Sequence, residues 1–121
     1  MKRMIVGSAL ALAMMIPAAA AQPAKPKSVI HIVNVKFKAD APKAEVDKAI
    51  AMVGQMDYPG LKNVWLKAIK NQMTPNFTHI LVMEFESEDA LKNYTDSPAQ
   101  KKWYEVYLKV REESRTNDVT N

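Results

Sequence analysis

Two segments of this chain are apolar on both faces of an extended backbone, which limits the possible folds more than any other feature. They are SVIHIVNVKF (residues 28–37) and FTHILVMEFE (residues 77–86), and neither contains glycine or proline. Strand side chains alternate between the two faces of a sheet, so helices that cover one face leave an apolar second face. We expect another copy of the chain to cover that second face, because such a patch is rarely left to water. Its residues are Ile30, Ile32, Ile80 and Val82.

The segments between these two strands predict one helix and one further strand. Residues 40–57 carry an apolar stripe at helical spacing, and Asp40 or Ala41 is the predicted cap of this helix. Residues 61–70 (LKNVWLKAIK) resume an extended pattern after the turn YPG. The stripe consists of Val46, Ile50, Val53 and Met56.

The last third of the chain predicts two helices and a final strand. Ser87 is expected to cap a short helix over 88–96, and Ser97 a longer one over 98–113. The tail SRTNDVTN (114–121) can supply the last strand. In the longer helix the buried stripe is formed by Trp103, Val106, Tyr107 and Val110.

The predicted order is strand, helix, strand, strand, helix pair, strand. This is an α+β, ferredoxin-like βαββαβ sandwich with helices on one face of an antiparallel-rich sheet. A second sheet from an identical subunit would close the open face. We therefore predict a homodimer that forms a dimeric α+β barrel.

The N-terminus is typical of a secretory signal peptide. Lys2 and Arg3 precede an apolar run that ends at Pro17, and Ala19-Ala20-Ala21 gives a small-residue cleavage site. The run is too short and too rich in alanine for a membrane span, so no stable membrane insertion is expected after cleavage. We predict a signal peptide over 1–21, a flexible leader over 22–28 and one domain over 29–120. The protein is then exported, to the periplasm or the cell exterior.

Charge and composition exclude several classes of partner. Loss of Lys2 and Arg3 takes 17 basic residues to 15 against 13 acidic ones, so the net charge falls from +4 to +2. This dispersed excess does not predict nucleic-acid binding. There is no cysteine, which excludes disulfides and thiolate metal sites. No carboxylate is obviously aimed at the histidines, so neither a metal nor another cofactor is predicted.

His31 and His79 are the only histidines, and each lies on the helix-facing side of its strand. Neighbouring strands lie about 4.8 Å apart, so we expect both to share the floor of a pocket between sheet and helices. Two imidazoles there could bind a ligand oxygen or move a proton near neutral pH. The alternative is a pair of core histidines bonded to each other or to a buried tyrosine. The full predicted pocket comprises His31, Val33, His79, Leu81, Tyr94, Gln100 and Trp103.

Tyr94 and Gln100 each have two possible roles. Tyr94 could relay a proton between the imidazoles, or could bridge the junction of the last two helices. In Ser97-x-x-Gln100 the two side chains are expected to form a capping box, with the glutamine accepting from the Ser97 N–H. Glutamine cannot accept or release a proton near pH 7, so Gln100 is no general base.

The chain resembles the stress-responsive A/B barrel (Dabb) family from about Val29 to Asp118. The resemblance depends on VIHIVNVKFK, YPGLKNVWLKAIKN, FTHILVMEFESEDALKNY, SPAQ and the late NDV. It implies a ferredoxin-like dimeric α+β barrel, in a family where most members have no established catalytic activity. One plant member is a cofactor-free polyketide cyclase whose pocket uses the positions of His31, His79 and Tyr94. Its base closes the motif HPAH, which reads SPAQ here, so Gln100 stands at the catalytic position.

These features predict an exported homodimeric A/B-barrel protein without cyclase activity. It is expected to bind a small apolar or aromatic ligand between sheet and helices. The alternative is a cofactor-independent cyclase, isomerase or monooxygenase that uses His31, His79 and Tyr94. A third hypothesis is a purely structural role in stress protection, which needs no pocket.

Overall fold

The computed structural model describes Gly7 and residues 22–121, which form four strands and three helices. The predicted signal peptide therefore lies outside the described residues apart from Gly7. The order of the elements along the chain is the predicted one, and they form a ferredoxin-like α+β fold. Their bounds are β1 Val29–Phe37, α1 Lys43–Gly54, β2 Leu61–Trp65, β3 His79–Phe85, α2 Glu88–Tyr94, α3 Pro98–Val110 and β4 Arg111–Val119.

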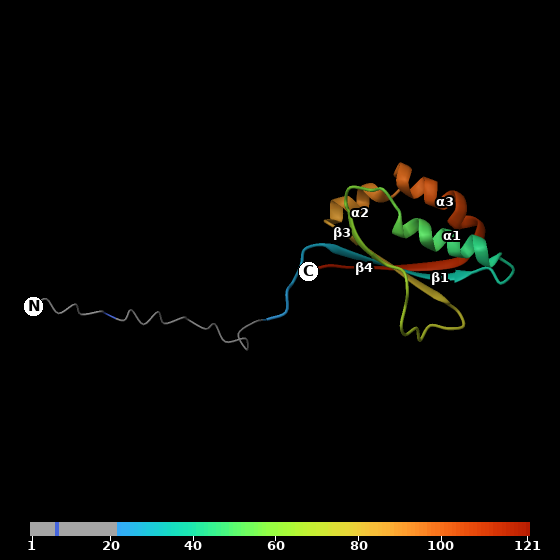
Figure 1. Cartoon of the computed structure of the whole chain (residues 1–121), viewed down its shortest axis with the longest axis horizontal. Helices are drawn as coiled ribbons and strands as arrows, with labels where there is room; N and C mark the ends of the chain where they lie inside the picture. Colours follow the sequence, from blue (N-terminus) through green and yellow to red (C-terminus); the bar gives the residue numbers. More distant parts are fainter. Residues whose placement is uncertain (1–6, 8–21) are drawn as a thin grey trace, which may run out of the picture.

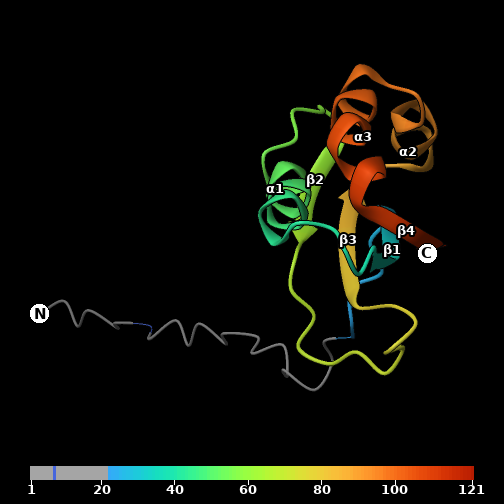
Figure 2. The same cartoon turned by 90° about the vertical axis from the view of Figure 1, so that its right-hand side faces the viewer.

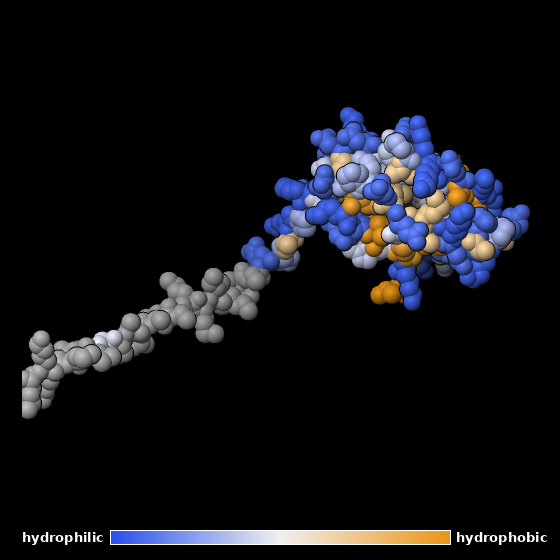
Figure 3. All heavy atoms as spheres, turned by 45° about the horizontal axis from the view of Figure 1, so that its top comes forward, coloured by the Kyte–Doolittle hydropathy of each residue, from blue (hydrophilic) through white to orange (hydrophobic). Residues whose placement is uncertain are grey.

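The strands form one antiparallel sheet in the order β2-β3-β1-β4, with the three described helices on a single face (Figure 1). Turned by 90°, the molecule shows α1 beside β2, and α3 between α1 and α2 (Figure 2). The outer surface on the helix side is largely hydrophilic, with hydrophobic patches between the polar side chains (Figure 3). The core fills the layer between helices and sheet.

The alternation of β1 and β3 decides which side chains enter that core. Residues of odd number on both strands face the helices, and the ones at the centre of the sheet are buried. Val33 pairs with Leu81 in the register, and the two are 4% and 1% exposed. From the helices the core receives Ala49, Val53, Tyr94, Trp103, Tyr107 and Val110.

The opposite face of the sheet carries the apolar patch that the sequence predicted. Ile30, Ile32, Ile80 and Val82 remain half-buried in the single chain. The register adds two neighbours, because Trp65 pairs with Val82, and Val119 with Ile30. Both of these are about half exposed, Trp65 at 50% and Val119 at 51%. We call these six residues the open face.

The helix caps were predicted correctly in two cases and wrongly in one. The hydroxyls of Ser87 and Ser97 accept hydrogen bonds from the N–H groups of Ala90 and Gln100. At α1, however, neither Asp40 nor Ala41 caps. Pro42 occupies the cap position without a side-chain bond, and its carbonyl accepts from the N–H groups of Glu45 and Val46.

The end of α3 also differs from the prediction. We expected the helix to continue to residue 113, since arginine and glutamate are good helix formers. Instead the helix ends at Val110, and Arg111 pairs with Phe37 in the sheet. The Lys38 N–H donates to the Val110 carbonyl at 2.8 Å, which fixes the turn from helix to strand. Pairing with β1 therefore outweighs local helix propensity.

The segment before β1 is held against the end of the chain. Residues 22–27 are exposed and belong to no helix or strand. The Thr120 hydroxyl donates to the Ser28 carbonyl at 2.8 Å, and the Asn121 side-chain amide donates to the Pro26 carbonyl at 2.8 Å. The part of the predicted leader next to β1 is thus tied to the C-terminus.

Candidate functional site

The two histidines face the helices, but they do not share a pocket floor. The register pairs His31 with Met83, and Val35 with His79. The histidines are therefore four positions apart along β1, which corresponds to about 13 Å. The expectation of a side-by-side pair is wrong, because the antiparallel register places them toward opposite ends of the sheet.

His31 is paired with a carboxylate from the neighbouring strand. Its Nδ1 lies 2.5 Å from Oδ1 of Asp118, the residue opposite it in the β1–β4 register. The side chains are 16% and 47% exposed. The other contact of the imidazole is an edge-on approach to the Phe85 ring, with centroids 6.1 Å apart.

His79 lies in a more apolar environment at the other end of the sheet. Its Nδ1 is 2.8 Å from the Thr78 hydroxyl, and its ring stands edge-on to Phe37 with centroids 4.8 Å apart. Loss of solvation lowers the pKa of His79, and the negative charge of Asp47 on α1 opposes that effect. The imidazole is therefore more strongly neutral at pH 7 than a free histidine.

Tyr94 does not reach either imidazole directly. Its ring packs against Tyr58 and Phe85, with centroids 5.5 and 5.0 Å away. Phe85 lies between Tyr94 and His31, and a phenylalanine ring cannot pass a proton. The predicted relay from Tyr94 to the histidines is therefore not supported by the geometry.

The hydroxyls of Tyr94 and Tyr107 are buried without a hydrogen-bond partner in the part of the chain that the structure describes. Burial raises the pKa of Tyr94, and the neighbouring phenols of Tyr104 and Tyr107 add to the shift. Burial also raises the pKa of Tyr107. Ser114 and Arg111 lower it in part, although neither forms a hydrogen bond with the hydroxyl. A buried polar group without a partner is uncommon and calls for a ligand or water.

Gln100 joins this group of phenols rather than closing the predicted capping box. Its side-chain oxygen accepts from the Asp96 N–H at 2.8 Å, whereas the Ser97 N–H donates to the Tyr94 carbonyl. Because Asp96 offers a donor, the oxygen of the amide is fixed on that side. Its Nε2 then points to the Tyr104 hydroxyl at 3.4 Å. We call Tyr94, Gln100, Tyr104 and Tyr107 the phenol cluster.

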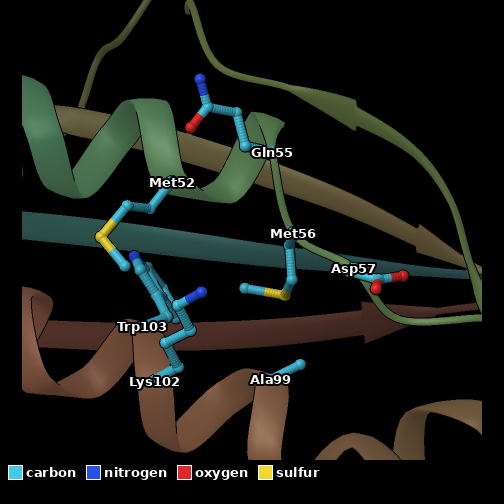
Figure 4. A pocket seen from close by; sticks show the side chains of 7 residues that line it. All are labelled: Met52, Gln55, Met56, Asp57, Ala99, Lys102 and Trp103. Atoms are coloured by element: carbon cyan, nitrogen blue, oxygen red, sulfur yellow. The ribbon is translucent and has the colours of Figure 1, made fainter.

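A hollow of about 210 Å³ opens between the end of α1 and the start of α3, close to this cluster. Trp103 forms its floor and stacks on Tyr107, with centroids 4.1 Å apart and planes 14° from parallel. The Trp103 Nε1 donates to the Ala49 carbonyl at 2.9 Å and so ties α3 to α1. Figure 4 shows Met52 and Met56 on the α1 side of the hollow, with Lys102 and Trp103 on the α3 side. The lining consists of Met52, Gln55, Met56, Asp57, Ala99, Lys102 and Trp103.

The predicted pocket is thus divided in the structure. Trp103 lines the hollow, Tyr94 and Gln100 belong to the phenol cluster, and Val33 and Leu81 are packed in the core below. His31 and His79 lie apart on the sheet. Sequence reasoning missed Tyr104 and Asp118, although Tyr104 follows Gln100 by four residues, a spacing at which helical side chains meet.

No group of three His, Cys, Asp or Glu side chains within the described residues could hold a metal ion. None of the helices in this described part of the chain is long and apolar enough to cross a membrane.

The sheet, its one-sided helix layer and its apolar open face define a ferredoxin-like α+β protein. The chain belongs to the stress responsive A/B barrel domain family, whose profile matches residues 29–121. No curated protein sequence matches it.

Solved structures share this fold at low sequence identity. A hydroxynitrile lyase from Passiflora edulis is 22% identical over 78% of this chain and 93% of its own, with a TM-score of 0.67. A dimeric ferredoxin-like protein of unknown function from Thermobifida fusca is 16% identical over 79% and 92%, with a TM-score of 0.66. SnoaB, a cofactor-independent oxygenase from Streptomyces nogalater, is 13% identical over 78% and 93%, with a TM-score of 0.62.

Proposed function

We propose that this is an exported, homodimeric A/B-barrel protein that binds a small aromatic or apolar molecule carrying a hydrogen-bond acceptor. The observation that carries the proposal is the pair of buried, unpartnered hydroxyls of Tyr94 and Tyr107 in the described interior. Both can donate, and burial keeps both neutral at physiological pH. A carbonyl or similar oxygen beside either hydroxyl would satisfy a donor that is otherwise costly to bury.

The hollow between α1 and α3 is the proposed entrance for this ligand. Its floor, Trp103, stacks directly on Tyr107, so the hollow and the phenol cluster are one ring apart. Met52 and Met56 beside the opening are unbranched and can repack around a guest. The aromatic rings around the cluster would contact the apolar body of the ligand.

Three features support binding without cyclase chemistry. Gln100 occupies the position of the base in the related cyclase and cannot exchange a proton near pH 7. Its oxygen is already engaged by the Asp96 N–H. The phenols and imidazoles are separated by phenylalanine rings, Phe85 on one side and Phe37 on the other.

A melting-temperature screen of the mature protein tests the ligand proposal. Aromatic ketones, phenolic esters and fatty acids are the probes, and at least one class is expected to raise the melting temperature. Tyr94→Phe and Tyr107→Phe should each weaken that shift. Tyr58→Phe is the matched control, since the Tyr58 hydroxyl already donates to the Ala90 carbonyl at 2.7 Å. A screen without a shift, or an equal shift in all variants, would count against the proposal.

The homodimer is proposed because a second sheet would cover the open face. Structural neighbours from Thermobifida fusca and Bacteroides fragilis are described as dimeric ferredoxin-like proteins. Sedimentation equilibrium of residues 22–121 should give twice the chain mass. A single-chain mass at high concentration would remove this part of the proposal.

Export is proposed from the basic start, apolar run and Ala19-Ala20-Ala21 of the sequence. When the full-length chain is expressed in a host that secretes proteins, it should be recovered outside the cytoplasm. Its intact mass should correspond to a chain that begins at Gln22. A cytoplasmic protein of full-length mass would contradict this proposal.

A cofactor-independent enzyme is the second candidate, favoured by the His31–Asp118 pair. A carboxylate 2.5 Å from one nitrogen of an imidazole fixes the orientation of the ring and leaves the other nitrogen to accept a proton, as a general base requires. His79 and Tyr94 are too far from His31 to take part in the proton transfer, so Asp118 replaces them as the partner of His31. Product analysis after incubation with the compounds that bind should show turnover that His31→Gln abolishes. Binding without turnover by the wild-type protein favours the first proposal.

A further inference from the structure

Residues 22–121 contain four methionines, and two of them line the hollow between α1 and α3. Met52 lies in the last turn of α1 and Met56 follows two residues after its end, and both side chains are partly buried. The other two differ from this pair, because Met73 is 47% exposed between β2 and β3, and Met83 in β3 is fully buried. The chain therefore holds thioethers in three different environments.

The two sulfurs of the hollow can be reached from solvent. The hollow encloses about 210 Å³, far more than one water molecule needs, so a molecule as small as hydrogen peroxide can enter it. Figure 4 shows both methionine side chains extending from the α1 side toward Trp103. Methionine sulfur packs well against aromatic rings, so the pair and the tryptophan together make the entrance apolar.

Oxidation by a peroxide would change the chemistry of this entrance. The sulfur attacks one oxygen of hydrogen peroxide, the O–O bond breaks, and an S–O bond forms. The proton of the transferred hydroxyl passes to the departing oxygen, which leaves as water. Sulfur thereby loses two electrons and the peroxide gains them. The product is methionine sulfoxide, which is polar where methionine is apolar.

A sulfoxide in the hollow would oppose the entry of an apolar molecule. Its oxygen is a hydrogen-bond acceptor, and an apolar ligand that displaces water from it offers no bond in return. Lys102 lines the hollow from the α3 side, and its ammonium group can donate to that oxygen. Such a bond would run across the opening, because the methionines belong to the α1 side. Both effects disfavour the apolar ligand, and neither requires a change in the phenol cluster.

We propose that Met52 and Met56 form a modification site, at which oxidation by peroxides to methionine sulfoxide closes the hollow to apolar ligands. The closure rests on the proposed function, because it acts on the entrance of that ligand, whereas the oxidation itself does not depend on any ligand. Enzymes that reduce methionine sulfoxide can reverse the change, so the site can switch in both directions.

Mass spectrometry of peptides tests the modification site. The mature protein is treated with increasing concentrations of hydrogen peroxide and then digested. Met52 and Met56 should each gain one oxygen atom at concentrations that leave Met83 unmodified, and Met73 serves as the exposed reference. Oxidation of Met52 and Met56 that occurs only together with that of Met83 would overturn the site.

Binding measured before and after oxidation tests the closure. The probes are acetophenone, phenyl acetate and decanoate, one from each class in the melting-temperature screen. For a probe that binds the untreated protein, oxidation should raise the dissociation constant at least about tenfold. In the double variant Met52→Leu, Met56→Leu the constant should be the same before and after treatment, since leucine has a similar volume and no sulfur. Met73→Leu is the matched control and should respond as the wild-type protein does.

The outcomes separate the closure from the proposed function. If no probe binds the untreated wild-type protein, the proposed function is contradicted and the closure with it, while the mass spectra still decide the modification site. A probe that binds the wild-type protein equally before and after oxidation of Met52 and Met56 refutes the closure alone. An equal loss of affinity in the double leucine variant also refutes the closure alone.

Discussion

Two phenol groups, those of Tyr94 and Tyr107, set the chemistry of the interior. Each is surrounded by aromatic rings, and neither hydroxyl meets an acceptor within the described residues. Tyr58, whose ring contacts Tyr94, shows how a buried phenol is usually satisfied, since its hydroxyl donates to a backbone carbonyl. The contrast indicates that Tyr94 and Tyr107 are kept for something other than packing, because phenylalanine would fill the same space.

Tyr94→Phe should stabilise the ligand-free protein, by about 1 kcal/mol, because it removes a buried donor without a partner. Tyr58→Phe should destabilise it by a similar amount, because the Ala90 carbonyl loses its donor. Urea unfolding of both variants at pH 7.5 measures the two effects. Equal destabilisation by both substitutions would show that the Tyr94 hydroxyl has a partner in solution.

High pH should unfold the protein through the same phenols. Burial raises the pKa of Tyr94 and Tyr107 above the unfolded value near 10. The unfolded chain then loses protons that the folded chain retains, so the contribution of these two phenols to stability is constant below about pH 9 and is lost as pH rises past 10. Urea midpoints at pH 8 and pH 11 should differ less in Tyr94→Phe than in the wild type. A wild-type midpoint that is equal at both pH values would contradict this.

His79 should make the protein sensitive to mild acid. Loss of solvation lowers its pKa below the ordinary value of 6.5. Between the lowered value and 6.5 the unfolded chain binds more protons, so stability decreases as pH falls through this window. His79→Gln should reduce the fall in urea midpoint between pH 7.5 and pH 5. The His31→Gln variant is the control for general acid effects, and an identical fall in both variants and the wild type would refute the role of His79.

Among the elements, α3 contributes the most residues to the candidate site. Its first turn holds Ser97 and Gln100, its buried stripe supplies Trp103 and Tyr107, and its end turns directly into β4. The same helix therefore positions three members of the phenol cluster and the floor of the hollow. Its start is fixed by a side-chain cap and its end by a backbone bond to the residue after β1. Loosening either end should move the cluster as a unit.

Ser97→Ala should cost about 1 kcal/mol in the free energy of unfolding, because the Gln100 N–H loses its acceptor. Ser97→Asp should retain most of the stability, since aspartate also caps and its charge suits a helix N-terminus. Urea unfolding at pH 7.5 compares the two. An aspartate variant as unstable as the alanine variant would show that the hydroxyl acts in some other way.

At the scale of the whole molecule, the open face links fold and assembly. Ile32 pairs with Val82 across β1 and β3, and Trp65 and Val119 extend the patch to both edges. If a second sheet covers it, unfolding and dissociation are coupled. The stability of the protein then depends on its concentration, whereas the stability of a monomer does not.

The melting temperature of the mature protein should rise with concentration, and Ile32→Asp should lower it and remove the dependence. A charge on the open face would have to be buried between the two sheets without a partner, which is strongly unfavourable. Leu108→Asp, on the outer side of α3, is the matched control and should leave both properties unchanged. A concentration-dependent melting temperature that persists in Ile32→Asp would argue against this interface.

Local sequence patterns were enough to predict the order of the elements and the faces of the strands. The two-faced pattern of residues 28–37 and 77–86 predicted the ferredoxin-like sheet and its apolar open face. Ser87 and Ser97 were correctly identified as caps. These features are local, because alternation and capping depend on residues within one or two turns of each other.

Which side chains meet, in contrast, depends on how the elements pack together. The antiparallel register separates His31 from His79 and sets His31 against Asp118, and no local pattern specifies a register. Pairing with Phe37 ends α3 at Val110 against the helix propensity of the residues that follow. The phenol cluster likewise appears only once α2 and α3 are packed on the sheet. Contacts between elements depend on how all the elements fit together, and that information is spread over the whole chain.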